Sequence, residues 1–139
     1  MEPVSLRFEI DGDCFTSAGQ ASSGVKAALK KLGIPADTIR RVAVCMYEGE
    51  INMVIHAHGG TACVEVDEKT ITMRLEDKGP GIPDVEKALS EGWSTATHRI
   101  REMGFGAGMG LPNMRRYCDE LDIQTELGVG TTVTMKINL

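Results

Sequence analysis

Three polar residues recur at four-residue intervals in one predicted helix and have side chains suited to acid–base and metal chemistry. They are Glu48, Asn52 and His56. Because a helix has 3.6 residues per turn, positions four apart lie close to one line along its surface. A glutamate can take a proton from an attacking hydroxyl or water, and an asparagine oxygen suits a Mg²⁺ ion otherwise held by phosphates and water. His56 is compatible with a site contact and with a hydrogen-bonded structural residue near the helix end.

The rest of this helix is mostly apolar, and that determines where the polar line must lie. Burying polar side chains without partners is costly, so a line of three on an otherwise apolar helix is best explained by a cleft. The alternative is a solvent-facing polar stripe on an amphipathic helix. The apolar residues are Ile39, Val42, Ala43, Val44, Met46, Ile51, Met53, Val54, Ile55 and Ala57.

A second motif, Asp77-x-Gly79-x-Gly81, follows a predicted strand. Its carboxylate can accept a hydrogen bond from the exocyclic amine of adenine, whereas guanine has a carbonyl there. The two glycines allow the backbone to approach a flat ring. Taken alone, such a motif is more typical of a turn, but beside Glu48 and Asn52 it predicts an adenine site.

The third motif is a glycine-rich run that contains Gly104, Gly106, Gly108 and Gly110. It lacks the Gly-Lys-Ser/Thr ending of a P-loop, and no strand leads directly into it as a dinucleotide-binding fold requires. It opens onto a helix predicted to begin at Pro112, where free N–H groups attract anions. The run therefore predicts a phosphate-binding loop; a mobile loop without a ligand is the alternative.

Composition narrows the function classes. A net charge of −5 and a charged content of 25% provide no broad basic field, which argues against nucleic acid as a partner. No segment approaches 18 consecutive apolar residues, and the amino terminus lacks the pattern of a signal peptide, so we expect a cytoplasmic protein that does not enter a membrane. Four cysteines without a C-x-x-C pair favour buried thiols in a reducing compartment over a metal or redox role.

The first half of the chain is predicted to form a strand and two helices. Leu6, Phe8 and Ile10 alternate with polar residues and predict a strand that ends at residues 11–13. A helix should follow, capped by Thr16 or Ser17 and ended by Gly33 and Pro35, before the helix of the polar line begins near residues 35–37 and ends at Gly59-Gly60.

The second half is predicted to be mostly strands. Residues 62–66 and 71–75 alternate around a polar turn and predict an antiparallel hairpin, and residues 121–127 and 131–137 predict two closing strands. A short helix is expected at 85–89 and a longer one from Pro112, after a long irregular segment that suggests a functional lid. The fold class is thus one α/β domain over residues 1–139, a two-layer sandwich with three helices on one face of a mostly antiparallel mixed sheet.

These motifs, in this order, resemble the nucleotide-binding boxes of the Bergerat-fold ATPases, the superfamily that includes gyrase, histidine kinases and MutL. The resemblance covers nearly the whole chain. Residues 91–95, 106–108 and 114–116, together with the small size, are most similar to its anti-sigma factor and switch serine-kinase branch. The four matching segments are Glu48–Ala57, Asp77–Pro83, Gly104–Leu111 and Gly128–Thr132.

The resemblance implies a role for each matching residue. Glu48 is expected to be the general base, Asn52 the Mg²⁺ ligand and Asp77 the adenine reader, with Thr132 near the base. Gly79 and Gly81 are expected under the adenine, and Gly104, Gly106, Gly108 and Gly110 around the phosphates of ATP. The lid, residues 93–103 with His98, Arg99 and Arg101, is expected either to face the γ-phosphate or a protein partner, or to be a solvated charge run.

Two functions follow from the resemblance and remain open from the sequence. The first is an ATP-dependent protein serine/threonine kinase that phosphorylates a STAS-domain antagonist and, in some members of the branch, also binds a sigma factor or activates a phosphatase. Members that bind sigma factors often form homodimers. The second is an ATP-sensing binding module with little or no turnover. A histidine kinase is disfavoured, because those proteins usually carry asparagine at the position of Glu48 and need a separate dimerisation helix.

Overall fold

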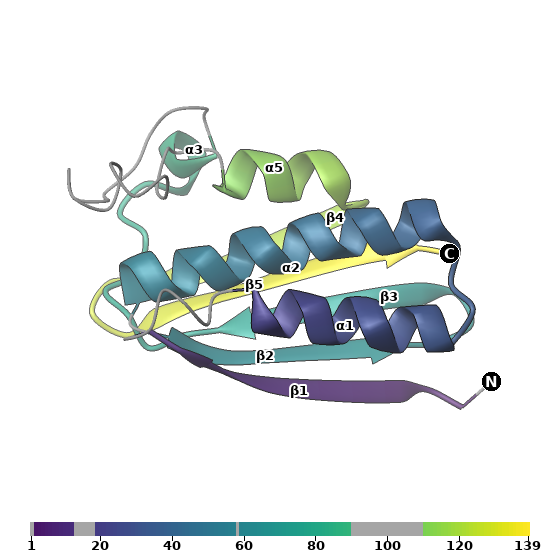
Figure 1. The fold of residues 1–139 in the computed structure, drawn as a ribbon. Helices are drawn as coiled ribbons and strands as arrows, with labels where there is room; N and C mark the ends of the chain where they lie inside the picture. Colours follow the sequence, from purple (N-terminus) through teal and green to yellow (C-terminus); the bar gives the residue numbers. More distant parts are fainter. Residues whose placement is uncertain (1, 13–18, 58, 90–109) are drawn as a thin grey trace.

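The computed structural model describes residues 2–12, 19–57, 59–89 and 110–139, and its centre is one five-stranded sheet (Figure 1). The strand order is β1-β2-β3-β5-β4, and all four pairings are antiparallel. The expectation of a mostly antiparallel sheet is confirmed, although no parallel pair among these strands makes it mixed. The strands are β1 (Val4–Asp11), β2 (Gly59–Val66), β3 (Thr70–Glu76), β4 (Glu120–Glu126) and β5 (Gly130–Asn138).

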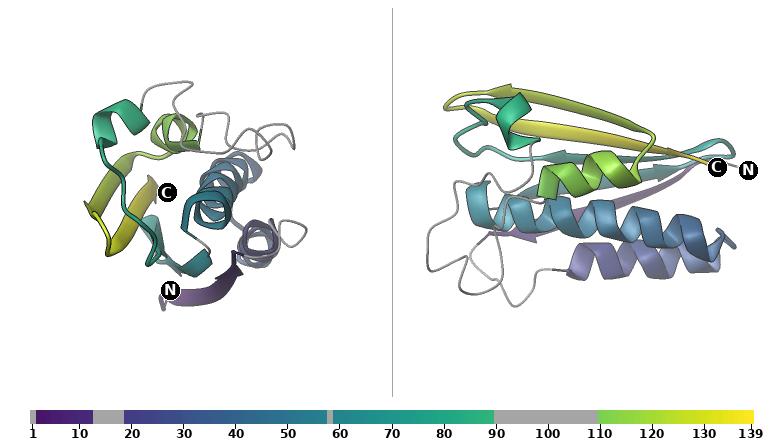
Figure 2. Two further views of the ribbon diagram at one scale, coloured as in Figure 1. Left: turned by 90° about the vertical axis from the view of Figure 1, so that its left-hand side faces the viewer. Right: turned by 90° about the horizontal axis from the view of Figure 1, so that it is seen from above.

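In the described part of the chain, three of the helices cover one face of this sheet, as predicted, and together with it they form a two-layer sandwich (Figure 2). The long helix α2 lies in the middle, between α1 on one side and α5 on the other. Among the described residues, no helix is both long and apolar enough to cross a membrane. The helices are α1 (Gln20–Lys31), α2 (Ala36–Ala57), the short α3 (Val85–Ala88) and α5 (Gly110–Tyr117).

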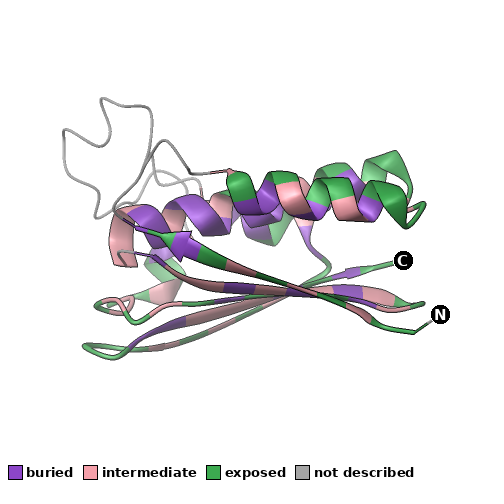
Figure 3. Ribbon diagram, turned by 60° about the horizontal axis from the view of Figure 1, so that its bottom comes forward, coloured by how far each residue is buried: buried purple, intermediate pink, exposed green. Residues whose placement is uncertain are grey.

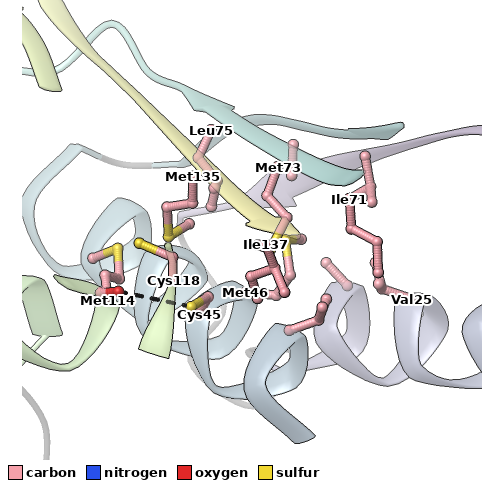
Figure 4. Close-up of a cluster of buried hydrophobic side chains, with 14 of the residues drawn as sticks. Val25, Cys45, Met46, Ile71, Met73, Leu75, Met114, Cys118, Met135 and Ile137 are labelled. Atoms are coloured by element: carbon pink, nitrogen blue, oxygen red, sulfur yellow. Dashed lines mark hydrogen bonds between the residues drawn. The ribbon is translucent and has the colours of Figure 1, made fainter. Parts of the chain in front are cut away.

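The core lies between the helical layer and the inner face of the sheet. Buried residues alternate with more exposed ones along β2 and β3, as expected (Figure 3). The buried strand residues belong to one core cluster with residues of the helices. A close-up shows methionine, isoleucine and valine side chains from β3, β5, α1 and α2 packed together (Figure 4). This packing holds the apolar side of α2 against the sheet and thereby fixes the position of the polar line that α2 carries.

Two glycines have a second role that the sequence did not indicate. We expected Gly59 and Gly60 only to end α2, but they also begin β2, where they pair with Asp11 and Ile10. Gly59 has a φ of +102°, and a Cβ atom there would lie 2.2 Å from the carbonyl oxygen of Ile10. Only glycine allows the chain to leave the helix and pair with β1 at once. The other helix and strand ends in the described residues lie close to their predicted positions. For example, α5 begins at Gly110 and not at the predicted Pro112.

The start of α1 is held by a residue from another helix. Thr16 and Ser17 lie outside the described residues, and the N-cap is Gly19, which makes no side-chain capping bond. Instead the carboxylate of Glu50 in α2 accepts backbone N–H bonds from Gly19 (2.8 Å), Ala21 (3.3 Å) and Ser22 (3.2 Å). Glu50 is only 2% exposed, so its charge is satisfied by the otherwise unpaired amides of a helix start.

Candidate active site

Helices α2 and α5 run antiparallel, and their contacts place the site. Near the carboxyl end of α5, the Arg41 guanidinium donates to the Tyr117 carbonyl (Nε to O, 3.0 Å). One turn further along α2, the thiol of Cys45 lies 3.9 Å from the carbonyl oxygen of Met114 (Figure 4). Following α2 toward its carboxyl end therefore leads toward the amino end of α5.

The predicted base and the predicted metal ligand are the next two residues of this contact line. Glu48 Oε1 accepts a hydrogen bond from Asn113 Nδ2 of α5 at 3.1 Å. Asn52 faces Gly110, the first residue of α5, and a Cβ atom on Gly110 would lie 3.0 Å from both amide heteroatoms of Asn52. Glu48 and Asn52 thus both lie at the amino-terminal half of α5, where anionic groups are stabilised by free N–H groups.

Asp77 lies just beyond the end of β3, and half of its carboxylate is already in use. Oδ1 accepts N–H bonds from Gly79 (2.9 Å) and Thr131 (3.2 Å), and the Asp77 N–H donates to the Thr131 carbonyl (2.9 Å). Across the described part of the chain, no hydrogen bond to Oδ2 is recorded. The carboxylate is therefore fixed by one oxygen, and the other remains able to accept from a ligand amine.

Thr131, rather than Thr132, lies on the same side of the sheet as Asp77. Thr132 pairs with the exposed Glu76 and shares its outward-facing side, whereas Thr131 is buried. The Thr131 hydroxyl lies 2.8 Å from that of Thr125, which in turn accepts from the Ile82 N–H at 2.8 Å. This chain of hydrogen bonds joins β4, β5 and the loop after Asp77, and it makes Thr131 the hydroxyl beside Asp77.

The two glycines after Asp77 lie in close contact with the rest of the site. A Cβ atom on Gly79 would lie 2.6 Å from the Cβ of Ala57, the last residue of α2. Gly81 follows Pro80, whose carbonyl accepts from the Gly128 N–H of the β4–β5 turn at 2.9 Å. The loop from Asp77 is thus held between the carboxyl end of α2 and the β4–β5 turn.

His56 occupies the last turn of α2 on the side of Asp77. Burial lowers the pKa of its imidazole below the ordinary value, while the Asp77 carboxylate opposes that shift. The neutral imidazole is therefore favoured near pH 7. Both interpretations of His56 from the sequence, a structural residue and a site contact, remain compatible with this place.

The remaining predicted site residues belong to the glycine-rich run and to the predicted lid. Gly104, Gly106 and Gly108, and the predicted lid at residues 93–103, lie outside the described residues. Of the glycine-rich run, the structure describes Gly110 alone, and it opens α5 beside Asn52.

The donor set fits a Mg²⁺ ion that arrives with a nucleotide better than a resident metal. Among the described residues, no three histidine, cysteine or carboxylate side chains are grouped as a metal site requires. Asn52 provides one neutral oxygen near a helix start suited to phosphates. Mg²⁺ is commonly held by one or two protein oxygens, with water and phosphates completing its octahedron.

Sequence reasoning missed Asn113, Thr125 and Thr131. The signal for Thr131 was present, because Val133, Met135 and Ile137 were expected on one face and Thr131 continues their alternation. No comparable pattern in the sequence indicated Asn113 or Thr125. Their roles depend on how α5 packs against α2 and how β4 meets the loop after Asp77.

A two-layer sandwich whose central helix carries an acid and an amide, with an aspartate just beyond β3 beside the end of that helix, is typical of a nucleotide-binding domain of the ATPase type. Comparison with known proteins agrees with this class: residues 15–137 match the family described as histidine kinase-like ATPase domain. The chain belongs to this family, which confirms the resemblance found from the sequence.

Curated relatives place the chain among regulators of this family. It is 31% identical over 108 residues to the serine/threonine-protein kinase RsbT of Bacillus subtilis, covering 75% of each chain. It is 31% identical over 120 residues to an anti-sigma F factor of Caldanaerobacter subterraneus, covering 83% of this chain and 80% of that protein. An anti-sigma F factor of Clostridium novyi is 30% identical over 125 residues, with coverage of 86% and 84%.

Proposed function

We propose that this protein is an ATP-dependent serine/threonine protein kinase that acts as a partner-switching regulator of the anti-sigma type. The observation that carries the proposal is the contact line along α2, which brings Glu48 and Asn52 to the amino-terminal half of α5 and ends beside Asp77. A kinase needs mainly to position ATP and to stabilise charge, and this arrangement provides groups for both. The similarity to RsbT, which is named as a serine/threonine-protein kinase, supports the same conclusion.

In this proposal, the two ends of the contact line along α2 bind different parts of ATP. The Oδ2 atom of Asp77 accepts from the adenine amine, while Thr131 provides the neighbouring hydroxyl. The phosphates lie at the start of α5, beside Gly110 and Asn52, and Asn52 would hold the Mg²⁺ that offsets phosphate charge. Glu48 takes the proton from the attacking hydroxyl. Gly104, Gly106 and Gly108 are proposed to surround the phosphates.

The protein substrate is proposed to be a small STAS-domain antagonist that is phosphorylated on serine. A sigma factor is the second kind of partner, as the anti-sigma names of two relatives suggest. A phosphatase, which the resemblance of the sequence also implied, is a further proposed partner. The homodimer and the cytoplasmic location expected from the sequence belong to the same proposal and are tested by the size and location of the native complex.

The decisive experiment combines partner capture with mass measurement. The purified protein and its Glu48→Ala variant are each incubated with lysate of the source cell and Mg-ATP, and captured proteins are analysed by intact mass. We expect a small partner that gains one phosphate with the wild-type protein and none with Glu48→Ala, because the variant lacks the base.

Glu65→Ala is the matched control, because Glu65 is an exposed glutamate on the outer face of β2. It should phosphorylate the partner as the wild type does. If ATP changes partner binding but no mass is added, the kinase proposal is wrong and the protein is an ATP-sensing binding module, in which nucleotide orders a surface without turnover.

A further inference from the structure

One oxygen of the proposed base is already bound by the protein. Glu48 Oε1 accepts from the side-chain amide of Asn113, 65 residues further along the chain, at 3.1 Å. Within the described ranges, this is the one hydrogen bond recorded for the Glu48 side chain. Oε2 is consequently the oxygen left to accept a proton.

The chemistry of the two groups fixes how the amide must be turned. An ionised carboxylate only accepts hydrogen bonds, whereas an asparagine offers both an NH₂ donor and a carbonyl acceptor. Asn113 must therefore present Nδ2 to Glu48, since its oxygen would be repelled. A hydrogen bond to a charged group is among the stronger ones in proteins, and it favours one orientation of the carboxylate.

Asn113 is itself held in place by contacts on both sides along α5. One turn toward the amino end, Gly110 packs against Asn52 so closely that a Cβ atom there would be 3.0 Å from its amide. Toward the carboxyl end, the Tyr117 carbonyl accepts from Arg41. A residue between two fixed contacts can orient its partner, because little movement of the helix backbone remains.

We propose that Asn113 is the positioning residue of the phosphoryl-transfer site: it holds Glu48 through Oε1 and so aims Oε2 at the attacking hydroxyl or water. This inference rests on the proposed function, in which Glu48 is the base. The amide touches Glu48, not the nucleotide, so its loss should lower the rate of the chemical step and leave nucleotide binding unchanged.

Two substitutions of nearly the same size as asparagine separate positioning from packing. Asn113→Leu removes the donor, and Asn113→Asp keeps the shape but places a carboxylate against that of Glu48. If Asn113 served packing alone, Asn113→Asp would behave like the wild type. A positioning role predicts that both variants carry out the chemical step more slowly than the wild type.

The test is single-turnover hydrolysis of Mg-[γ-³²P]ATP by an excess of protein, with water as the acceptor. Protein concentration is varied to separate the maximal rate from the half-saturating concentration, and a urea unfolding curve verifies that each variant is folded. We expect both Asn113 variants to lower the maximal rate about 10- to 100-fold and to change the half-saturating concentration by less than about twofold.

Glu48→Ala and Asn138→Leu serve as references. Asn138 is exposed at the end of β5, and its recorded hydrogen bond, to Asp119, uses the backbone N–H, so substitution of its side chain should leave the maximal rate unchanged. If Glu48→Ala abolishes turnover while both Asn113 variants keep the wild-type rate, the inference is overturned and the proposed function stands. A raised half-saturating concentration at full rate would make Asn113 a nucleotide contact and also overturn it. If Glu48→Ala hydrolyses ATP like the wild type, the proposed base is wrong and the inference fails with it.

Discussion

At the scale of single residues, Asp77 has one carboxylate oxygen fixed by the protein, while the other is the proposed ligand acceptor. Oδ1 is committed to the N–H groups of Gly79 and Thr131, which fixes the plane of the group. An asparagine at this position can keep both bonds through its amide oxygen, but it then presents an NH₂ donor at the place where Oδ2 is proposed to accept. The substitution therefore changes the chemistry toward the ligand and preserves the local structure.

We expect Asp77→Asn to weaken ATP binding about 10- to 100-fold, the effect of losing a hydrogen bond to a charged acceptor. Isothermal titration calorimetry measures this directly. Asp67→Asn is the control, because Asp67 likewise accepts backbone bonds, from Lys69 and Thr70, but lies in the β2–β3 turn. Equal affinities for the two variants would contradict the assignment of Asp77.

Thr131 and Thr132 provide a second comparison at this scale. Thr131→Val removes the hydroxyl bonded to Thr125, and we expect ATP affinity to fall about 3- to 10-fold. Thr132→Val changes the opposite face of β5 and should leave affinity unchanged. The same titration measures both, and the reverse result would favour Thr132, the residue expected from the sequence.

The sequence offered candidate site residues that carry charge or require glycine, but it did not indicate the residues that contact them. Glu48, Asn52 and Asp77 occur in recognisable spacings, because the chemistry demands particular side chains at particular points of one helix or one strand end. The contact of Asn113 with Glu48 arises from packing between helices 65 residues apart, and no local pattern encodes it.

At the scale of elements, Glu50 joins two helices that the sequence predicted separately. Hydrophobic periodicity located both α1 and α2, but it could not show that a glutamate of α2 caps α1. A glutamate in an apolar stripe gave no sign of its partners, since these are backbone amides about 30 residues earlier in the chain.

We expect Glu50→Ala to lower the free energy of unfolding by about 3 kcal/mol, because three N–H groups at a buried helix start lose their acceptor. Glu50→Gln, which retains one acceptor oxygen, should lose less. Urea denaturation followed by circular dichroism provides the measurement. Glu65→Ala, exposed on β2, is the reference, and equal stability of the two alanine variants would refute the capping role.

At the scale of the whole molecule, Asp119 connects the two layers. Its carboxylate accepts from the Asn138 N–H of β5 at 2.7 Å and forms an ion pair with Arg41 of α2 at 3.1 Å. The Asn138 N–H first, and then Arg41, hold the pKa of Asp119 below its ordinary value. This contribution to stability is therefore present above about pH 4 and is lost as pH falls through the lowered pKa.

Asp119→Asn should accordingly be less stable than the wild type at pH 7, and the difference should shrink as pH falls below about 4. Urea midpoints at several pH values measure the trend. Asp122→Asn, on the exposed face of the adjoining strand β4, is the control and should differ from the wild type by the same amount throughout. A pH-independent deficit in Asp119→Asn would contradict the role assigned to its charge.

The layered architecture was predictable because alternation and helical periodicity are local signals that agree along the chain. The points where one helix or strand meets the next were harder to predict from the sequence. The start of β2 at Gly59 depends on pairing with β1, nearly fifty residues away, which no turn signal within residues 57–61 reveals.

The β3–β5 junction has a consequence for how the protein folds. β2–β3 and β4–β5 are hairpins with short turns, which can form rapidly because their contacts are local. Asp77 and Thr131, 54 residues apart, meet only where one hairpin docks on the other. The proposed adenine site is therefore incomplete in either hairpin alone. If ATP binds there as proposed, we expect it to bind only the docked chain and to shift the folding equilibrium toward that chain by mass action, so that the nucleotide would act as a folding ligand as well as a phosphate donor.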